Sequence, residues 1–239
     1  MREKTTAIVL AAGQGKRMKS KTQKQFLELE GYPVLYYSLK CFQDYTGIDE
    51  IVLVTGKEEI EYSRTEIAEK YSLTKVRKII PGGKERYDSV YQGLLACEDA
   101  KYVLVHDGAR PFVTAEILER VMSGVRKYKA CIAAVPSKDT VKLADGEGCV
   151  ASTPPRERVW NIQTPQAFEY GVLRSAHEKI REKDLSQITD DAMVVEQEGE
   201  CRVKLEMGGY ENLKITTPDD LEIARSILRQ RERQKKERK

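Results

Sequence analysis

The residues best placed to do chemistry follow directly on the first apolar run of the chain. The run at residues 7–9 leads into Leu-Ala-Ala-Gly-Gln-Gly-Lys-Arg-Met at residues 10–18. Glycines allow backbone N–H groups to approach a phosphate closely, and Lys16, Arg17 and Lys24 supply positive charge. We therefore expect an anion to bind here, at the end of a strand.

Two common phosphate-binding loops are excluded by spacing. A Walker loop has four residues between its glycines and then Lys-Ser/Thr, whereas a single residue separates Gly13 from Gly15. A dinucleotide-binding fingerprint needs a third small residue where this chain has Met18. The remaining alternative is an ordinary glycine-rich turn, which the cations behind the glycines argue against.

Similar polar clusters follow other apolar runs. They lie at residues 81–89, 106–111 and 138–140, with Lys214 near the end of the chain. Ligands of open α/β sheets bind at the carboxyl ends of the strands. We therefore predict that these clusters and the 10–18 loop meet at one edge of a sheet.

Short apolar runs alternate with amphipathic helical patterns throughout the chain. Strands are expected at residues 7–11, 51–54, 76–80, 102–105, 131–135, 203–205 and 213–215. Helices are expected at residues 33–45, 58–71, 88–97, 114–129, 169–182, 190–198 and 218–231. Strands that are apolar throughout are buried on both faces, as in parallel sheets with helical crossovers. The sequence thus predicts a single α/β domain over residues 1–239, with a mostly parallel, Rossmann-like sheet flanked by helices.

Residues 137–160 break this alternation. Residues 138–143 and 149–153 alternate weakly around the turn-like segment 145–148, the composition of a β-hairpin. An isolated two-stranded hairpin is marginally stable in water. We expect a projecting arm that rests on a second subunit, the alternative being a loose surface hairpin.

The charge distribution argues against a nucleic-acid-binding protein. The 239 residues carry a net charge of +3, but residues 229–239 hold seven cations and two anions, so the other 228 residues carry −2. A slightly acidic body lacks the charge of a nucleic-acid binder. The basic tail is expected to be a solvated, fraying helix end, with a docking site for an acidic partner as the alternative.

Cysteine usage and the first apolar run indicate the compartment. The five cysteines show no Cys-x-x-Cys spacing and no neighbouring histidine, which favours a reducing, cytoplasmic setting over disulfide or metal sites. The first apolar run, residues 7–12, is short and ends in glycine and cations. We therefore expect neither a signal peptide nor a membrane span.

Eight segments, taken in order, match the motifs of one family. They are Leu-Ala-Ala-Gly-x-Gly-x-Arg-Met (10–18), Lys-Gln-Phe (24–26), Gly-Gly-x-Glu-Arg-x-x-Ser-Val (82–90), His-Asp-Gly-Ala-Arg-Pro (106–111), Lys-Asp-Thr (138–140), Gln-Thr-Pro-Gln (163–166), Ile-Thr-Asp-Asp (188–191) and Asn-Leu-Lys (212–214). The chain resembles the 2-C-methyl-D-erythritol 4-phosphate cytidylyltransferases of the non-mevalonate isoprenoid pathway from about residue 5 to 228. It departs from the family at Leu10, where proline is frequent, and at Lys84, where aspartate is common.

The resemblance implies a nucleotide-diphosphosugar transferase-like fold and a homodimer with shared active sites. The implied reaction is attack by the 4-phosphate of the polyol phosphate on the α-phosphorus of CTP, with Mg²⁺ bridging the CTP phosphates and pyrophosphate leaving. A phosphate monoester has a second pKa of about 6 and is mostly dianionic at neutral pH, so no general base is required. His106 and His177 accordingly receive no catalytic role.

The resemblance also implies a role for each site residue. Arg17 and Lys24 would stabilise the transition state, and Arg156 and Lys214 would position the polyol phosphate. The residues implied to bind the nucleotide are Ala11, Ala12, Gly13, Gly15, Gly83, Ser89, Asp107 and Gly108. Those implied to bind the polyol phosphate are Arg110, Thr140 and Thr164. For Thr189 and Asp190, a helix cap and a site role stay open.

Two other functions compete with this one. A ribitol or ribulose 5-phosphate cytidylyltransferase resembles it closely, but tends to differ at residues 88–90, 107–110 and 189–191. A non-catalytic nucleotide-binding module is the second alternative. It could dispense with Arg17 and Lys24, and both are present.

Overall fold

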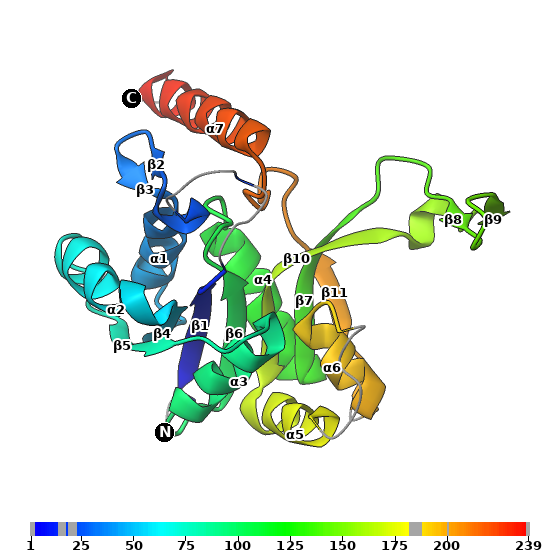
Figure 1. The fold of residues 1–239 in the computed structure, drawn as a ribbon, viewed down its shortest axis with the longest axis horizontal. Helices are drawn as coiled ribbons and strands as arrows, with labels where there is room; N and C mark the ends of the chain where they lie inside the picture. The colour runs from blue at the N-terminus through cyan, green and yellow to red at the C-terminus, as the bar shows by residue number, and fades with distance from the viewer. Residues whose placement is uncertain (1–2, 14–17, 19–22, 182–187, 200, 238–239) are drawn as a thin grey trace.

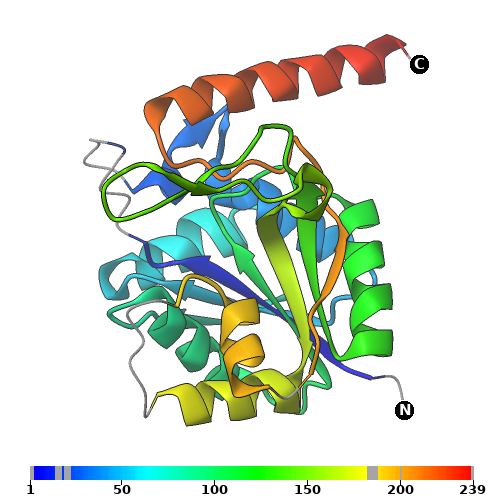
Figure 2. The same ribbon diagram turned by 90° about the vertical axis from the view of Figure 1, so that its right-hand side faces the viewer.

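A seven-stranded sheet lies at the centre of the protein, with helices on both faces (Figure 1, Figure 2). The structure is a computed structural model that describes residues 3–13, 18, 23–181, 188–199 and 201–237. The strands of this sheet are β1 (Thr5–Ala11), β4 (Glu50–Thr55), β5 (Val76–Pro81), β6 (Tyr102–Asp107), β7 (Ala130–Pro136), β10 (Trp160–Glu169) and β11 (Lys204–Met207). Their order is β11-β7-β10-β6-β1-β4-β5, and only the two pairings of β10 are antiparallel. The predicted mostly parallel α/β sheet is confirmed.

Helices cover both faces because successive strand residues point to opposite sides. The helices are α1 (Val34–Asp44), α2 (Ile60–Tyr62), α3 (Arg86–Ala96), α4 (Ala115–Tyr128), α5 (Tyr170–Ile180), α6 (Asp191–Glu198) and α7 (Pro218–Glu237). On β6, Leu104 packs in the core formed with α1 and α4. Its neighbours Val103 and Val105 pack in the core formed with α3, α5 and α6. Residues 58–71, predicted as one helix, form a 3₁₀ turn (Lys57–Glu59), the short α2 and a π-helical segment (Ser63–Glu69).

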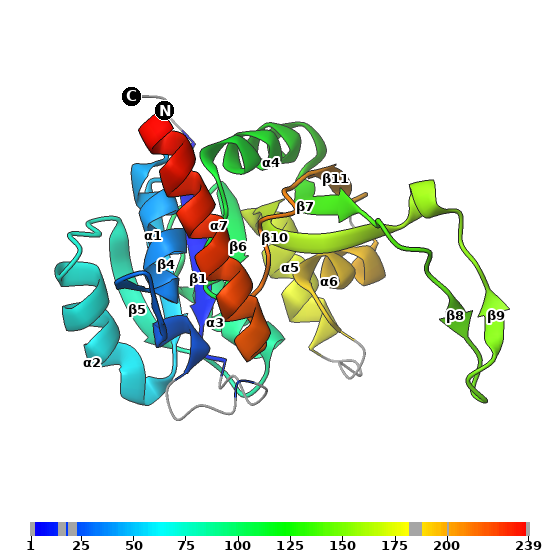
Figure 3. The ribbon, with the colours of Figure 1, turned by 90° about the horizontal axis from the view of Figure 1, so that it is seen from above.

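Helix α7 lies across the end of the molecule that carries the small β2 (Glu28–Leu29) and β3 (Tyr32–Pro33) pair (Figure 3). It continues to Glu237, beyond the predicted end at residue 231, because its arginines, lysines, glutamates and glutamines favour helix. Arg229 forms an ion pair with Glu30 at 3.2 Å, and Arg231 with Glu211 at 2.7 Å. The first turns of the basic tail therefore contact the body of the protein.

Strand β10 is the main element that the sequence patterns did not predict. It lies between β6 and β7, and residues 163–168 are buried although several of them are polar. The pairing with β7 shifts register between Ile162 and Gln166, around Pro165, which has no N–H to donate to a ladder. The strand predicted at residues 213–215 is wrong. That segment is irregular, and Ile215 N donates to Ala109 O at 2.9 Å.

Residues 137–160 project from the sheet as a hairpin arm, as predicted (Figure 1, Figure 3). Its antiparallel strands are β8 (Leu143–Ala144) and β9 (Val150–Ser152), and Leu143 and Val150 are 54% and 62% exposed. Two strands this short do not bury their own apolar side chains. Across the described part of the chain, none of the helices combines the length and apolar character needed to cross a bilayer. All five cysteines lie in the described ranges, and none of them is joined in a disulfide.

Candidate functional site

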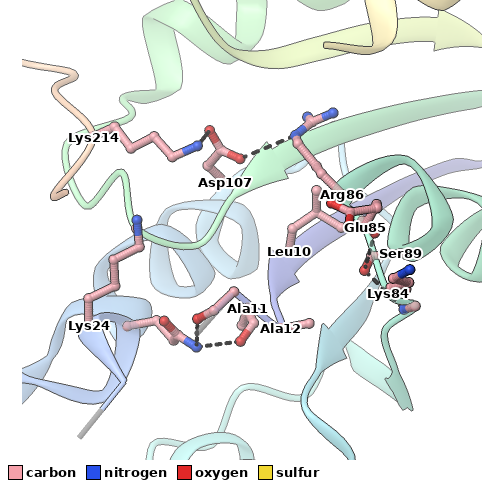
Figure 4. A pocket seen from close by; sticks show the side chains of 14 residues that line it. Leu10, Ala11, Ala12, Lys24, Lys84, Glu85, Arg86, Ser89, Asp107 and Lys214 are labelled. Atoms are coloured by element: carbon pink, nitrogen blue, oxygen red, sulfur yellow. Dashed lines mark hydrogen bonds and ion pairs between the residues drawn. The ribbon is translucent and has the colours of Figure 1, made fainter. Parts of the chain in front are cut away.

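A cavity of about 680 Å³ opens at the carboxyl ends of β1 and β6 (Figure 4). The predicted nucleotide-binding residues that line it are Ala11, Ala12, Gly13, Gly83, Ser89 and Asp107. Lys24 and Lys214 also line it. The loops after β1, β5 and β6 therefore meet at one sheet edge, as expected, whereas the 138–140 cluster, predicted to join them, does not line the cavity. Gly15 and Arg17 lie outside the described residues.

Asp107 is the electrostatic centre of this cavity. Its carboxylate Oδ2 lies 2.9 Å from Lys214 Nζ and 3.5 Å from Arg110 Nε, and its Oδ1 lies 3.8 Å from Arg86 Nε. Figure 4 shows Lys214 and Arg86 reaching this carboxylate from opposite sides. Burial alone would raise the pKa of Asp107, but the three cations hold that pKa well below its ordinary value. Asp107 is therefore ionised.

A second buried carboxylate fixes Arg86. Arg86 Nη2 lies 2.7 Å from Asp191 Oδ2, and His177 Nε2 lies 3.6 Å from Asp191 Oδ1. Burial acts to lower the pKa of Arg86, but the carboxylates of Asp191 and Asp107 hold it above its ordinary value. The sequence reasoning did not assign Arg86 to the site. Its place in the 82–90 motif, two residues before the helix predicted at 88–97, was the available signal.

These charges leave a surplus of positive potential at the cavity. Arg86, Arg110 and Lys214 face two carboxylates, those of Asp107 and Asp191, which leaves one net positive charge. Lys84 and Glu85, which also line the larger cavity, carry opposite charges, and the positively charged Lys24 lies across it (Figure 4). A partly enclosed site of this sign attracts an anionic ligand.

The loop that leads into α3 is held by its own polar groups. Gly83 N donates to Ser89 Oγ at 3.0 Å, and Ser89 Oγ donates to Glu85 O at 3.2 Å. The side chain of Glu85 caps α3 reciprocally with Asp88. A Cβ on Gly83 would lie 2.3 Å from Asp88 Cβ, so only glycine allows the chain to pass so closely. This packing places α3's first turn at the cavity wall.

Gln25 is a second residue that the sequence reasoning missed. It is buried, and its side-chain amide donates to Ala11 O and to Gly13 O at 3.3 Å. The amide thereby ties the end of β1 to the segment that carries Lys24. The only signal in the sequence was its place beside Lys24 in the Lys-Gln-Phe motif.

A smaller cavity of about 260 Å³ adjoins the first and shares Arg86, Asp107 and Lys214 with it. Arg110 and Thr164, predicted to bind the polyol phosphate, line this second cavity. Thr189 and Asp190 line it as well. Asp190 Oδ1 accepts from Met193 N at 2.9 Å and caps α6, while Oδ2 accepts from Gln166 Nε2 at 2.9 Å. Its helix-cap role is therefore present at the wall of a cavity.

Three of the predicted site residues that the structure describes line neither cavity. Thr140 and Arg156 are exposed on the arm, where Arg156 Nη2 donates to Thr140 Oγ1 at 3.3 Å. Gly108 lies beneath the site. A Cβ there would come within 2.7 Å of Leu35 Cδ1 and 3.0 Å of Leu10 O. Glycine at 108 thus allows the turn after β6 to lie close to Leu35 of α1 and to the end of β1.

Replacing Asp191 by asparagine is expected to lower the free energy of unfolding by about 3–5 kcal/mol, because Arg86 loses the buried partner of its charge. The matched control is Asp44→Asn, which removes the exposed pair with Lys40 and should cost less than about 1 kcal/mol. Urea unfolding at neutral pH measures both.

The same pair predicts a pH dependence. The pKa of Asp191 is lowered in the folded protein. Burial acts to raise this pKa, but the opposing effects of Arg86 and His177 together are larger. Its contribution to stability is therefore complete above the unfolded pKa of about 3.9 and disappears as the pH falls through the folded pKa. The gap between wild type and Asp191→Asn should narrow in acid. Equal losses of unfolding free energy in Asp191→Asn and Asp44→Asn would contradict the role of Asp191 as the buried partner of Arg86.

Comparisons with known proteins agree on one family. Residues 5–230 match the family model described as 2-C-methyl-D-erythritol 4-phosphate cytidylyltransferase. The chain is 50% identical over 228 residues to the protein of that name from Lachnoclostridium phytofermentans, covering 95% of this chain and 97% of the relative. It is similar to the crystal structure of 4-diphosphocytidyl-2C-methyl-D-erythritol synthase from Anaerococcus prevotii, with a TM-score of 0.85, 37% identity and coverage of 95% and 96%. A Thermus thermophilus cytidylyltransferase structure matches with a TM-score of 0.74, 29% identity and coverage of 95% and 99%.

Proposed function

We propose that the two adjoining cavities around Asp107 are the active site of a 2-C-methyl-D-erythritol 4-phosphate cytidylyltransferase. The chain belongs to that family and so transfers CMP from CTP to this polyol phosphate in isoprenoid biosynthesis. The observation that carries this placement is the buried carboxylate of Asp107 with three cations around it at the strand ends. Cavities of about 680 and 260 Å³ that share a cationic wall suit a nucleotide beside a smaller phosphate ester.

The reaction requires little covalent participation from the protein. An oxygen of the 4-phosphate attacks the α-phosphorus of CTP, and a new P–O–P bridge forms. The bond from the α-phosphorus to the bridging oxygen of the β-phosphate breaks, and pyrophosphate leaves with that electron pair. The attacking monoester is already dianionic, so positioning and charge neutralisation supply the catalysis.

We propose for these residues the roles that membership of the family implies. Lys24, together with Arg17, stabilises the charge that develops on the triphosphate, and Lys214 positions the polyol phosphate. Nucleotide contacts are assigned to Ala11, Ala12, Gly13, Gly15, Gly83, Ser89, Asp107 and Gly108. Contacts to the polyol phosphate are assigned to Arg110, Thr164 and, from the arm, Thr140 and Arg156.

We propose that CTP enters as its Mg²⁺ complex. Within the described ranges, no group of three or more His, Cys, Asp and Glu side chains could hold a metal ion. Asp107 is already paired with Lys214. Mg²⁺ keeps several waters and takes phosphate oxygens readily, so the donor set suits a cation that arrives with the nucleotide. Bound in this way, it would neutralise charge on the phosphates.

We further propose a homodimer in which the arm completes the partner's site. A cytoplasmic setting fits five described cysteines that form no disulfide. The support for the dimer is that Thr140 and Arg156 are exposed on a hairpin with uncovered Leu143 and Val150. A hairpin of this size with exposed apolar side chains gains stability by packing on another surface.

Pyrophosphate release with a panel of polyol phosphates tests the function. Pyrophosphate should appear with CTP, Mg²⁺ and 2-C-methyl-D-erythritol 4-phosphate, and hardly at all with ribitol 5-phosphate or when ATP replaces CTP. A preference for ribitol 5-phosphate would establish the alternative transferase. Binding of CTP by calorimetry without turnover on any acceptor would instead indicate a non-catalytic nucleotide-binding module.

A further inference from the structure

His106 lies fully buried beneath the site, and no step of the proposed reaction uses it. It is the residue of β6 that precedes Asp107, and its ring packs edge-on against Phe42 with centroids 5.1 Å apart. A buried imidazole carries two nitrogens that need hydrogen-bond partners. Both nitrogens have one, and both partners belong to the wall of the site.

The hydrogen bonds assign the protons of this ring. His106 Nε2 lies 3.3 Å from Arg110 O, and a carbonyl only accepts, so Nε2 carries the proton. Thr164 Oγ1 accepts from Asp107 N at 3.0 Å and lies 3.0 Å from His106 Nδ1. The threonine hydroxyl therefore donates to an unprotonated Nδ1. One neutral tautomer satisfies every group, and burial, which lowers the pKa of His106 to about 4, keeps it neutral.

We infer that His106 is a positioning residue that, with Thr164, holds the turn at residues 107–110 from both ends. At one end of the turn, the Thr164 hydroxyl links the two groups: it donates to His106 Nδ1 and accepts from the backbone N–H of Asp107. At the other end, His106 Nε2 donates to the carbonyl of Arg110. The side chains of Asp107 and Arg110 leave this turn for the cavities. The inference rests on the proposed function, because those two side chains are assigned to substrates there.

The chemistry is sensitive to this turn. Lys214, Arg110 and Arg86 lie 2.9 to 3.8 Å from the Asp107 carboxylate. A displacement of about 1 Å in a catalytic arrangement can cost about a hundredfold in rate. Loosening the turn should therefore lower kcat more than it weakens CTP binding.

Two substitutions at His106 separate its hydrogen bond to Thr164 from its hydrogen bond to Arg110 O. We call these two bonds the His106 clamp. In His106→Gln, the amide nitrogen can take the place of Nε2 and donate to Arg110 O, but the acceptor for Thr164 is lost. In His106→Asn, the amide oxygen can take the place of Nδ1 and accept from Thr164, but the bond to Arg110 O is lost. Thr164→Val keeps the shape of the side chain and removes the relay itself.

We expect His106→Gln and Thr164→Val each to lower kcat about tenfold to a hundredfold, with KM for CTP changed less than about threefold. The double variant should be no slower than Thr164→Val alone, because Thr164→Val already removes the bond that His106→Gln breaks. His106→Asn combined with Thr164→Val should be additive. Additive losses for His106→Gln with Thr164→Val, or losses in all variants that simply follow a fall in Tm, would overturn the proposal.

¹⁵N NMR measures the protonation of the two ring nitrogens of His106 independently of enzyme activity. The chain has only two histidines, so ¹⁵N-histidine labelling with a His177→Gln variant assigns the ring signals of His106. We expect Nε2 protonated and Nδ1 unprotonated, with Nδ1 alone shifting strongly in Thr164→Val. A protonated Nδ1, or no response to Thr164→Val, would overturn the clamp. Absence of wild-type pyrophosphate release beside the expected spectra would instead refute the proposed function.

Discussion

Replacing Lys24 by alanine is expected to lower kcat for pyrophosphate release by about a hundredfold or more. Lys24 lines the larger cavity, and its charge is assigned to the triphosphate, where negative charge develops in the transition state. Arg17→Ala is expected to act in the same way. Lys70→Ala is the matched control, because Lys70 pairs with Glu66 on an exposed surface, and it should leave kcat within about twofold.

Lys214→Ala distinguishes the cation assigned to the polyol phosphate from Lys24 and Arg17, which are assigned to the triphosphate. It should lower kcat and also raise KM for the polyol phosphate, while CTP binding measured by calorimetry stays nearly intact. The physical reason is that Lys214 belongs to both cavities, whereas Lys24 lines only the larger one. Loss of CTP binding in Lys214→Ala, with polyol phosphate binding retained, would reverse the assignment.

Mixing two inactive variants is expected to restore activity. Arg17→Ala and Arg156→Ala chains, unfolded and refolded together, should recover about a quarter of wild-type turnover. The proposed dimer places Arg156 of the arm at the partner's site, while Arg17 serves its own. In each mixed dimer one site then carries both substitutions and the other carries neither.

The recovery follows from random pairing in a two-fold dimer. About half of the dimers are mixed, and each mixed dimer has one intact site of two. Each variant refolded alone is the control and should stay inactive. If both arginines served the same chain's site, every site would carry one substitution. Mixed dimers, verified by mass, that remain as inactive as the two parents would therefore refute the shared site.

The sequence alone determined where the loops meet. Strands that are apolar throughout must lie inside a sheet with both faces covered, and parallel strands end at one edge. Glycine and charge after three such strands, at residues 10–18, 81–89 and 106–111, were enough to predict the cavity's position. The ordered motifs identified the family on the same residues. This information is local, since each part of it depends on neighbours within about ten residues.

Strand β10 was not predictable in this way, for a local reason. It carries polar residues and Pro165 instead of an apolar run, and only its place between β6 and β7 buries it. Lys214 was assigned to a strand that does not form. Its segment is held instead by Asp220, which accepts from the backbone N–H groups of Thr216 and Thr217 at 2.8 Å.

The tertiary structure alone decided which charges face one another. Lys214 forms an ion pair with Asp107. Arg86 forms one with Asp191, which lies 105 residues further along the chain. The single ring of His106 joins Thr164 to Arg110 in the same way. Periodicity reports which face of a strand or helix is buried, but it carries no information on which distant polar side chains that burial forces together. Those pairs form because charged and polar groups taken out of water must find partners, and only the packed chain brings the partners within reach.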